Sequence, residues 1–228
     1  MFKNLVHQKN KAVIISREKI SNNLLKVDFE TNHIEYTPGE YITLFIANIV
    51  PRNYSIFSVS QDKKIFSIIV NINGDGIGRR SIRQFVTYEK VSYIGPLGDF
   101  KFNKNDNSTN IWFIATGSGI SPLYQMILDN KNKYNISLFF SANKKEEFPN
   151  LKFEGIKTYF SITKEDKDWE GDRGRVTHTV RNMLLSYPNK DNISFYICGN
   201  PNMVKDTNMM LLNEGIARDK IYFEKFGF

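Results

Sequence analysis

Ala115-Thr116-Gly117-Ser118-Gly119-Ile120-Ser121-Pro122 is the stretch that decides the fold of the second half of the chain. It joins the hydrophobic run Ile111 to Ala115, which predicts a buried strand, to a segment from about Ser121 to Asp129, which predicts a helix. Glycines in such a turn let backbone N–H groups approach a phosphate at the positive end of the helix. Pro122 suits the first turn of that helix, where a missing N–H costs nothing. The stretch predicts a dinucleotide-phosphate turn, and a plain tight turn is the alternative.

The turn departs from the common dinucleotide fingerprint, because Pro122 stands where a third glycine is usual. The next predicted strand ends at Ser141-Ala142-Asn143, without the acidic residue that usually holds an NAD ribose. Lys144 and Lys145 follow instead, and they suit either a 2′-phosphate or a solvated loop.

The rest of the second half alternates between apolar strands and amphipathic helices. Such alternation predicts a parallel, doubly wound sheet. Further strands are expected at Ile136–Ser141, Lys157–Ile162, Ile193–Ile197 and Ile221–Phe223, with helices near Val176–Leu185 and Asn202–Asn213.

The first half has a different rhythm, with short stretches of period-two alternation separated by turn residues. Leu25, Val27 and Phe29 alternate with polar neighbours, as in a half-buried strand. Short strands at this spacing predict an antiparallel barrel or sandwich. Further strands are expected at Tyr41–Ile46, Tyr54–Val59, Ile65–Ile72 and Lys90–Ile94. The polar run 103–110 marks the boundary, so we expect domains at residues 1–102 and 103–228.

Two segments of the first half could bind a phosphorylated, aromatic ligand. In Arg52-Asn53-Tyr54-Ser55, Arg52 and Tyr54 share one strand face, and they offer a bidentate donor and an aromatic ring. Gly78-Arg79-Arg80-Ser81 leads into a short helix whose amides and hydroxyl suit an anion. The alternatives are a surface strand and a capped helix with solvated arginines.

Composition restricts the partners, the metal sites and the cellular location that we expect for the protein. The formal net charge is +7 and the pI about 9.3, which suits an acidic partner. The basic residues are scattered rather than striped, so we expect no nucleic-acid role. A single cysteine, Cys198, excludes an intramolecular disulfide and a four-cysteine metal site, and we expect no metal. With no signal peptide and no apolar run of membrane-spanning length, we expect a cytoplasmic monomer without a membrane partner.

Six motifs together resemble the ferredoxin–NADP reductase superfamily across essentially the whole chain. In chain order they are Arg-x-Tyr-Ser, Gly-x-x-Ser, Gly-Pro-Leu-Gly-x-Phe, Ala-Thr-Gly-Ser-Gly-Ile-Ser-Pro, Cys-Gly-Asn-Pro-x-Met and a terminal Glu-Lys-Phe. The resemblance implies an FAD-binding, Greek-key antiparallel β-barrel followed by an NAD(P)-binding α/β domain with a doubly wound parallel sheet.

The resemblance also implies roles for individual residues. Catalysis would involve Ser55, near flavin N5, with Cys198 and Glu224 beside the nicotinamide and Phe226 covering the flavin. The FAD site would comprise Arg52 on the pyrophosphate, Tyr54 on the isoalloxazine, and Asn53, Ile69, Gly78, Arg80 and Ser81. The NAD(P) site would comprise Thr116, Gly117, Gly119, Ile120, Pro122, Asn143, Lys144, Arg175, Cys198, Gly199 and Met203.

Two details of the resemblance are left open by the sequence. The chain continues through Gly227-Phe228, so either Phe226 or Phe228 could stack on the flavin, and we expect Phe226. Asn143 and Ile162 stand where NADPH-using bacterial relatives tend to carry arginine, but Arg175 fits a third such position. We expect NADPH as the donor, with NADH or dual use as the alternative.

The resemblance therefore predicts an FAD-dependent reductase that transfers a hydride between NAD(P)H and FAD and exchanges single electrons with an acidic ferredoxin or flavodoxin. A free-flavin reductase and a stand-alone reductase component of an oxygenase are the alternatives within the same chemistry. A non-catalytic subunit would need none of Ser55, Cys198 and Glu224, and their joint presence argues against it.

Overall fold

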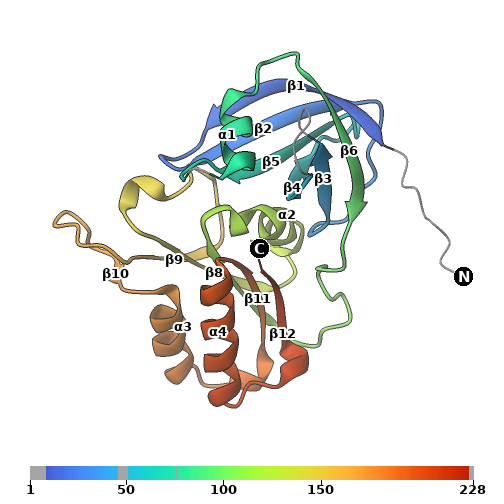
Figure 1. The fold of residues 1–228 in the computed structure, drawn as a ribbon. Helices are drawn as coiled ribbons and strands as arrows, with labels where there is room; N and C mark the ends of the chain where they lie inside the picture. Colours follow the sequence, from blue (N-terminus) through green and yellow to red (C-terminus); the bar gives the residue numbers. More distant parts are fainter. Residues whose placement is uncertain (1–8, 46–50, 75, 226–228) are drawn as a thin grey trace, which may run out of the picture.

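The computed structural model describes residues 9–45, 51–74 and 76–225, which form a β-barrel and an α/β sheet (Figure 1). The closed barrel has the strand order β1-β2-β5-β4-β3-β6, and its paired strands are antiparallel. The barrel elements are β1 (Asn10–Lys19), β2 (Leu24–Thr31), β3 (Tyr41–Phe45), β4 (Arg52–Val59), β5 (Ile65–Asn71), α1 (Ile77–Gln84) and β6 (Lys90–Leu97).

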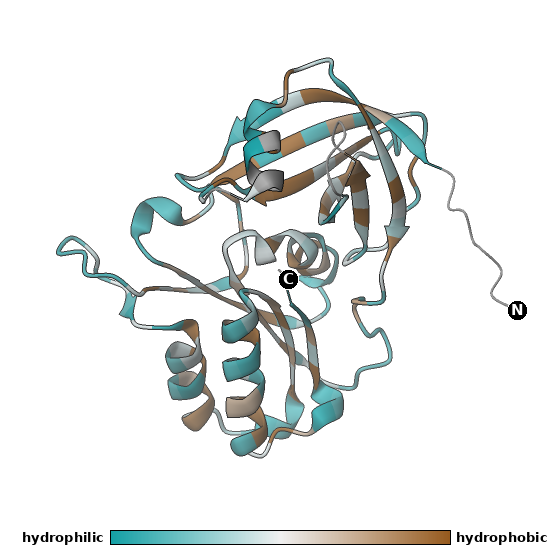
Figure 2. Ribbon diagram, in the orientation of Figure 1, coloured by the Kyte–Doolittle hydropathy of each residue, from teal (hydrophilic) through white to brown (hydrophobic). Residues whose placement is uncertain are grey.

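The barrel interior is filled by the apolar residues of alternating strands. Figure 2 shows hydrophobic and hydrophilic residues alternating along the barrel strands. Phe29 and Phe66 are fully buried and stack with their ring centroids 5.0 Å apart. The Tyr93 hydroxyl, also inside, lies 3.1 Å from the Thr31 Oγ1. Alternating burial of this kind closes the sheet around a packed core.

The second sheet is parallel and has the strand order β10-β9-β8-β7-β11-β12. The chain enters at β7, runs outward to β10, and then crosses back to β11, so the order switches between β7 and β11. Helix α2 lies on the barrel side of this sheet, and α3 and α4 lie on the other side (Figure 1). Its elements are β7 (Asn110–Thr116), α2 (Ile120–Asn130), β8 (Asn135–Ala142), β9 (Lys157–Ile162), β10 (Asp172–Arg173), α3 (Val176–Leu185), β11 (Ile193–Gly199), α4 (Pro201–Asn213) and β12 (Ile221–Lys225), with short 3₁₀ turns at Gly117–Gly119, Lys145–Glu147, Lys190–Asn192 and Arg218–Lys220.

The predicted fold class is confirmed, with two additions. The sequence patterns did not predict β1, whose apolar alternation is broken by a register shift between Ile14 and Ser16. They also did not predict β10, whose two residues are too few to show a period. None of the helices in the described residues is both long and apolar enough to cross a lipid bilayer.

The two halves share one hydrophobic core at the interface of α2 with β4. Phe57 of β4 stacks on Tyr124 of α2 with a centroid distance of 4.5 Å. The buried Ser121 hydroxyl donates to the backbone carbonyl of Ser55 at 3.0 Å. Ile20, Leu24 and Ile69 of the barrel half join this cluster, which extends into the core of the parallel sheet.

Backbone hydrogen bonds add a second link between the halves. The turn between β1 and β2 pairs with the segment that follows β8. The N–H of Asn22 donates to the carbonyl of Glu146 at 2.9 Å, and the N–H of Asn150 donates to the carbonyl of Ile20 at 2.8 Å. The segment that follows β8 is therefore held directly against the barrel.

Replacing Phe57 with alanine should destabilise the whole protein, because the ring fills the shared core. Truncation of a buried phenylalanine typically costs about 3–5 kcal/mol of unfolding free energy. Chemical denaturation followed by tryptophan fluorescence would measure the loss. Tyr88→Ala, at a side chain that is 81% exposed, is the matched control and should change little. Equal effects of the two variants would contradict the shared-core interpretation.

Candidate functional site

The carboxyl ends of the parallel strands meet β4 of the barrel, and we call this junction, around Ser55, Cys198 and Glu224, the crevice. Ligands of doubly wound sheets bind outside the strand ends, at the point where the strand order switches. Here that point lies between β7 and β11. The interface of α2 with β4 brings Ser55 to the same place.

Three of the residues that the resemblance implies for catalysis lie together in this crevice. The Ser55 Oγ donates to Oε2 of Glu224 at 3.4 Å, a long contact that joins β4 to β12. Cys198 pairs directly with Glu224 in the register of β11 and β12. The structure therefore brings together a hydroxyl, a thiol and a carboxyl from three strands. Phe226 and Phe228 lie outside the described residues, so their expected stacking on the flavin stays a prediction.

Burial sets the protonation of these groups near neutral pH. Removal from water raises the pKa of Glu224 from 4.5 to about 7, and the Ser55 hydrogen bond opposes that rise. The pKa of the fully buried Cys198 thiol is raised well above its usual value, first by burial and then by the charge of Glu224. The thiol is therefore neutral, and the carboxyl can hold or release a proton.

The turns after β7 and β11 pack so closely that two positions require glycine. A Cβ on Gly119 would lie 2.2 Å from the carbonyl oxygen of Cys198. A Cβ on Gly199 would lie 2.4 Å from Oγ1 of Thr116, and its φ of +141° also disfavours a side chain. The Thr116 Oγ1 accepts the N–H of Asn200 at 3.1 Å, which fixes the two turns to each other.

The predicted phosphate turn of the second half has the expected form. A 3₁₀ turn over Gly117–Gly119 leads directly into α2, and Pro122 lies in the first turn of that helix. Ile120 and Pro122 are buried, so their part in a nucleotide site would be structural or through the backbone. Met203, in the first turn of α4, packs against the core under α3 and α4.

The residues expected at FAD lie on three barrel elements. Arg52 begins β4 and is exposed, and Tyr54 is half-buried two residues further on. The Oδ1 of Asn53 accepts a hydrogen bond from the Thr43 hydroxyl at 2.8 Å, which orients that side chain. Ile69 is buried on β5, while Gly78, Arg80 and Ser81 all fall within α1.

The far end of the crevice, at β8 and β9, carries polar groups that the sequence did not single out. The buried Ser161 hydroxyl has no hydrogen-bond partner among the described residues, and it pairs in register with Ser141 of β8. The Glu147 carboxylate accepts the backbone N–H of Asn143 at 3.0 Å and its side-chain amide at 3.1 Å. An acidic residue, Glu147, is therefore present just after β8. It lies four residues beyond Asn143, where the strand-end position of the common dinucleotide fingerprint falls.

NADPH-using bacterial relatives tend to carry arginines that bind the 2′-phosphate, and of the matching positions only residue 175 is an arginine here. Ile162 is buried and faces the core. Arg175 lies at the start of α3, where Nη1 forms an ion pair with Oδ2 of Asp206 at 3.0 Å. Lys144 is exposed beside Glu147. This end of the crevice thus carries charges of both signs.

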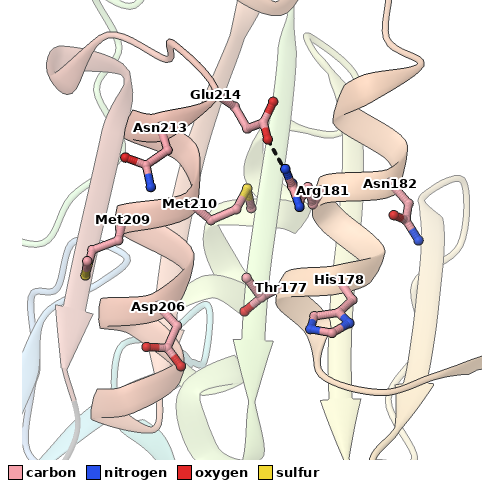
Figure 3. Close-up of a pocket in the computed structure, with 9 residues that line it drawn as sticks. All are labelled: Thr177, His178, Arg181, Asn182, Asp206, Met209, Met210, Asn213 and Glu214. Carbon is pink, nitrogen blue, oxygen red and sulfur yellow. Dashed lines mark hydrogen bonds and ion pairs between the residues drawn. The ribbon is translucent and has the colours of Figure 1, made fainter.

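A separate groove of about 500 Å³ lies between α3 and α4, on the side of the sheet away from the barrel (Figures 1 and 3). Met209 and Met210 line it, and the Nε of Arg181 bonds to Oε1 of Glu214 at 2.8 Å at one end. The groove contains none of the residues expected at a cofactor. It lies outside the crevice.

Comparison with known families and proteins agrees with this division of the chain. The oxidoreductase FAD-binding domain family matches residues 11–102, and the oxidoreductase NAD-binding domain family matches residues 113–209. The NADH-cytochrome b5 reductase 2 of Pyricularia oryzae is 27% identical over 169 residues, covering 68% of this chain and 51% of that protein. The chain spans between about half and two thirds of the length of the curated relatives that it matches.

Solved structures share the fold over almost the whole chain. A ferredoxin reductase of carbazole 1,9a-dioxygenase superposes with a TM-score of 0.88 at 20% identity, covering 96% of this chain and 70% of that one. A ferredoxin NADP⁺ reductase from Neisseria gonorrhoeae, with bound FAD and NADP, superposes with a TM-score of 0.84 at 18% identity. That match covers 95% of this chain and 98% of the other.

Barrel, switch-point crevice and family matches together define a protein with an FAD-binding domain followed by an NAD-binding domain. The chain belongs to the ferredoxin–NADP reductase superfamily. Its first domain is accordingly the part that binds FAD, and its second domain the part that binds NAD(P)H.

Replacing Glu224 with glutamine should change how stability depends on pH. The folded pKa of about 7 lies above the ordinary 4.5, so the folded state binds this proton more tightly than the unfolded state. That stabilisation is fully present below pH 4.5 and is lost as the pH rises through about 7. Glu224→Gln should therefore gain about 1–3 kcal/mol relative to wild type between about pH 5 and pH 8.

Urea denaturation of both proteins at several pH values would measure this difference. Glu214→Gln is a control, because the pKa of that carboxyl is lowered by its hydrogen bond with Arg181. Parallel stability curves for wild type and Glu224→Gln would contradict the raised pKa.

Proposed function

We propose that this protein is an FAD-dependent reductase that oxidises a nicotinamide nucleotide at the crevice and passes electrons to a carrier protein. The Ser55–Glu224 contact carries the proposal, because it joins the barrel to the last strand of the sheet at the switch point. The residues fit the two cofactors. The carboxyl ends of the strands supply polar groups, including the Ser161 hydroxyl, which has no hydrogen-bond partner in the part of the chain that the structure describes, and β4 supplies Arg52 and Tyr54.

FAD would be held at Arg52 and Tyr54, and when bound it would supply the hydride and single-electron chemistry. The chain's own residues would bind and orient the two cofactors, and they would exclude water from the space between them. Ser55 is held from two sides, by its carbonyl to Ser121 and by its hydroxyl to Glu224, so its side chain has a fixed direction. The neutral Cys198 thiol is a small, fully buried group that lies beside Glu224.

Glu224 is placed to hold a proton in the crevice. Its pKa of about 7 means that the carboxyl is present in both forms at neutral pH. In the protonated form it can donate a hydrogen bond to a carbonyl or amide group, and in the ionised form it can accept a hydrogen bond from Ser55 or a proton from solvent. This exchange is the chemistry that we assign to the residue.

The proposed electron acceptor is a small acidic carrier, a ferredoxin or flavodoxin or a protein with similar charge. Most of the net positive charge of the chain lies in residues 1–102, which also carry Ser55. Complementary charge speeds the encounter of two proteins. The relatives named above are reductases of cytochrome b5 and of ferredoxin-type carriers, which supports a protein acceptor. A free-flavin reductase remains the alternative, and it would release its flavin on purification.

Ser55→Ala should slow the reduction of bound FAD by about ten- to a hundredfold. Without the serine hydroxyl the nicotinamide and the flavin would no longer be held in the reactive geometry, and much of the rate advantage of that geometry would be lost. Anaerobic stopped-flow reduction, followed by the bleaching of the flavin absorbance, measures the rate. FAD content should stay at the wild-type level. Ser58→Ala, three residues along the same strand, is the control. An unchanged rate in Ser55→Ala would refute the assigned role, and a purified protein without flavin would favour the free-flavin reductase.

We further propose NADH as the preferred donor, against the NADPH expected from the sequence. The Glu147 carboxylate at the end of β8 can accept the two ribose hydroxyls of NADH and would repel a 2′-phosphate. Arg175, the one matching arginine, already faces Asp206. The exposed lysines beside Glu147 offer point charges without a bidentate fork. The relatives whose names specify NADH are consistent with this preference.

Steady-state kinetics with each nucleotide would test the preference. We expect kcat/KM for NADH to exceed that for NADPH by about tenfold, the ratio that 1.4 kcal/mol produces. Glu147→Gln should reduce this ratio, whereas Glu146→Gln removes the same charge one residue away and should leave it unchanged. A preference for NADPH in wild type would overturn the proposal and restore the expectation from the sequence.

A further inference from the structure

Helix α1 is held at its carboxyl end by a side chain from a distant strand. Arg17, on β1, directs its guanidinium at the last turn of the helix. Its Nη2 donates to the carbonyl of Arg83 at 2.8 Å and to that of Ile82 at 3.3 Å. Its Nη1 donates to the carbonyl of Phe85. Three carbonyls at one helix end are therefore bound by one side chain that lies 65 to 68 residues away in the sequence.

The helix end needs such a partner, because it ends without a glycine cap. The C-cap residue Phe85 has a φ of −51° and a ψ of 135°, so the chain turns straight into extended backbone. The last carbonyls of a helix have no partner within the helix, and they form the negative end of its dipole. The planar fork of an arginine can bond several of them and adds a favourable charge.

The same end of α1 is fixed to the barrel by packing. Ile82 and Phe85 are 0% and 1% exposed, and they belong to the barrel core. Arg83, also in the last turn, reaches back to the turn that precedes the helix. Its Nη1 donates to the carbonyl of Ile72 at 2.6 Å and to that of Gly74 at 3.1 Å. The carboxyl end of α1 therefore sets both the direction of the helix and the position of the turn before it.

We propose that Arg17 is a positioning residue for FAD, acting on the cofactor through α1. The inference rests on the proposed function and on placing the FAD pyrophosphate at the amino end of α1, where the family resemblance implies Gly78, Arg80 and Ser81 as FAD-site residues. An anion at the amino end and a cation at the carboxyl end stabilise the same helix dipole from opposite sides. Arg17 keeps the helix directed at the pyrophosphate and lowers the cost of ordering it when FAD binds.

The test measures FAD release from the intact holoprotein. Arg17→Gln should release FAD about tenfold faster, because cation–dipole and helix-end hydrogen bonds of this kind carry about that factor. The release is followed by flavin fluorescence after dilution. Arg17→Lys keeps the charge and loses the fork, so it should lie between wild type and Arg17→Gln. Lys19→Gln removes an exposed charge two residues along the same strand and should have no effect.

Two further readouts separate positioning from a general loosening of the barrel. The absorbance spectrum and the reduction potential of the FAD that remains bound should not change in either Arg17 variant, because the isoalloxazine lies away from α1 in this proposal. A changed spectrum, or a release rate equal to that of wild type, would overturn the role of Arg17. Should Arg17→Gln fail to fold, the release rate of Arg17→Lys decides between the same outcomes.

Arg80→Gln tells a failure of this inference from a failure of the placement on which it rests. If only Arg80→Gln releases FAD faster, the pyrophosphate lies at α1 and Arg17 does not position it. Wild-type release in both Arg80→Gln and Arg17→Gln would move the pyrophosphate away from α1 altogether.

Discussion

The packing of α2 against β4 is the contact on which the rest of the architecture depends. One side of this helix supplies Tyr124 to the ring stack with Phe57, and its first turn supplies the hydroxyl that binds the carbonyl of Ser55. Its amino end begins at the glycine turn after β7. A single helix therefore fixes the barrel, the sheet and the phosphate turn relative to one another. An independent pair of domains joined only by a linker would not hold Ser55 and Glu224 in one place.

The crevice that results has the electrostatic character of a partly dry site. Loss of water disfavours the charged form of an acid, so the pKa of a carboxyl in such a place is raised and a thiol stays protonated. The structure applies both effects to Glu224 and Cys198, which are neighbours on adjacent strands. At this point of the crevice the thiol is neutral and the carboxyl can be protonated at neutral pH.

Most of the fold could be predicted from the sequence because its two halves have different periods. The alternation of two in the first half and the strand–helix alternation in the second are local properties, and each survives in the structure. β1 escaped prediction because its register shifts at Ile15, which breaks the period of two. β10 escaped because two residues have no period at all. Glycine turns were visible since close approach of β7 and β11 permits only glycine at Gly119 and Gly199.

Some residues of the candidate site could not be found by pattern. Glu147 lies beyond the strand end, in a 3₁₀ turn that folds back onto Asn143, so its place depends on a local geometry that strand spacing does not reveal. Arg17, on β1, bonds to the end of α1, 66 residues away at Arg83, and nothing in the neighbouring sequence marks it. The roles of Ser55, Cys198 and Glu224 came from the family resemblance; the fold adds the reason that three distant residues meet.

The Ser55–Glu224 contact joins residues 169 positions apart, and this separation has a consequence for how the site is assembled. Bringing such distant residues together costs loop-closure entropy, so folds rich in such contacts fold slowly. A folded barrel without the docked sheet would contain Arg52, Tyr54 and Ser55 but no partner for the serine. Flavin held by such an intermediate would lack the nucleotide half of the site. The arrangement therefore leaves the site incomplete until the sheet has docked on the barrel.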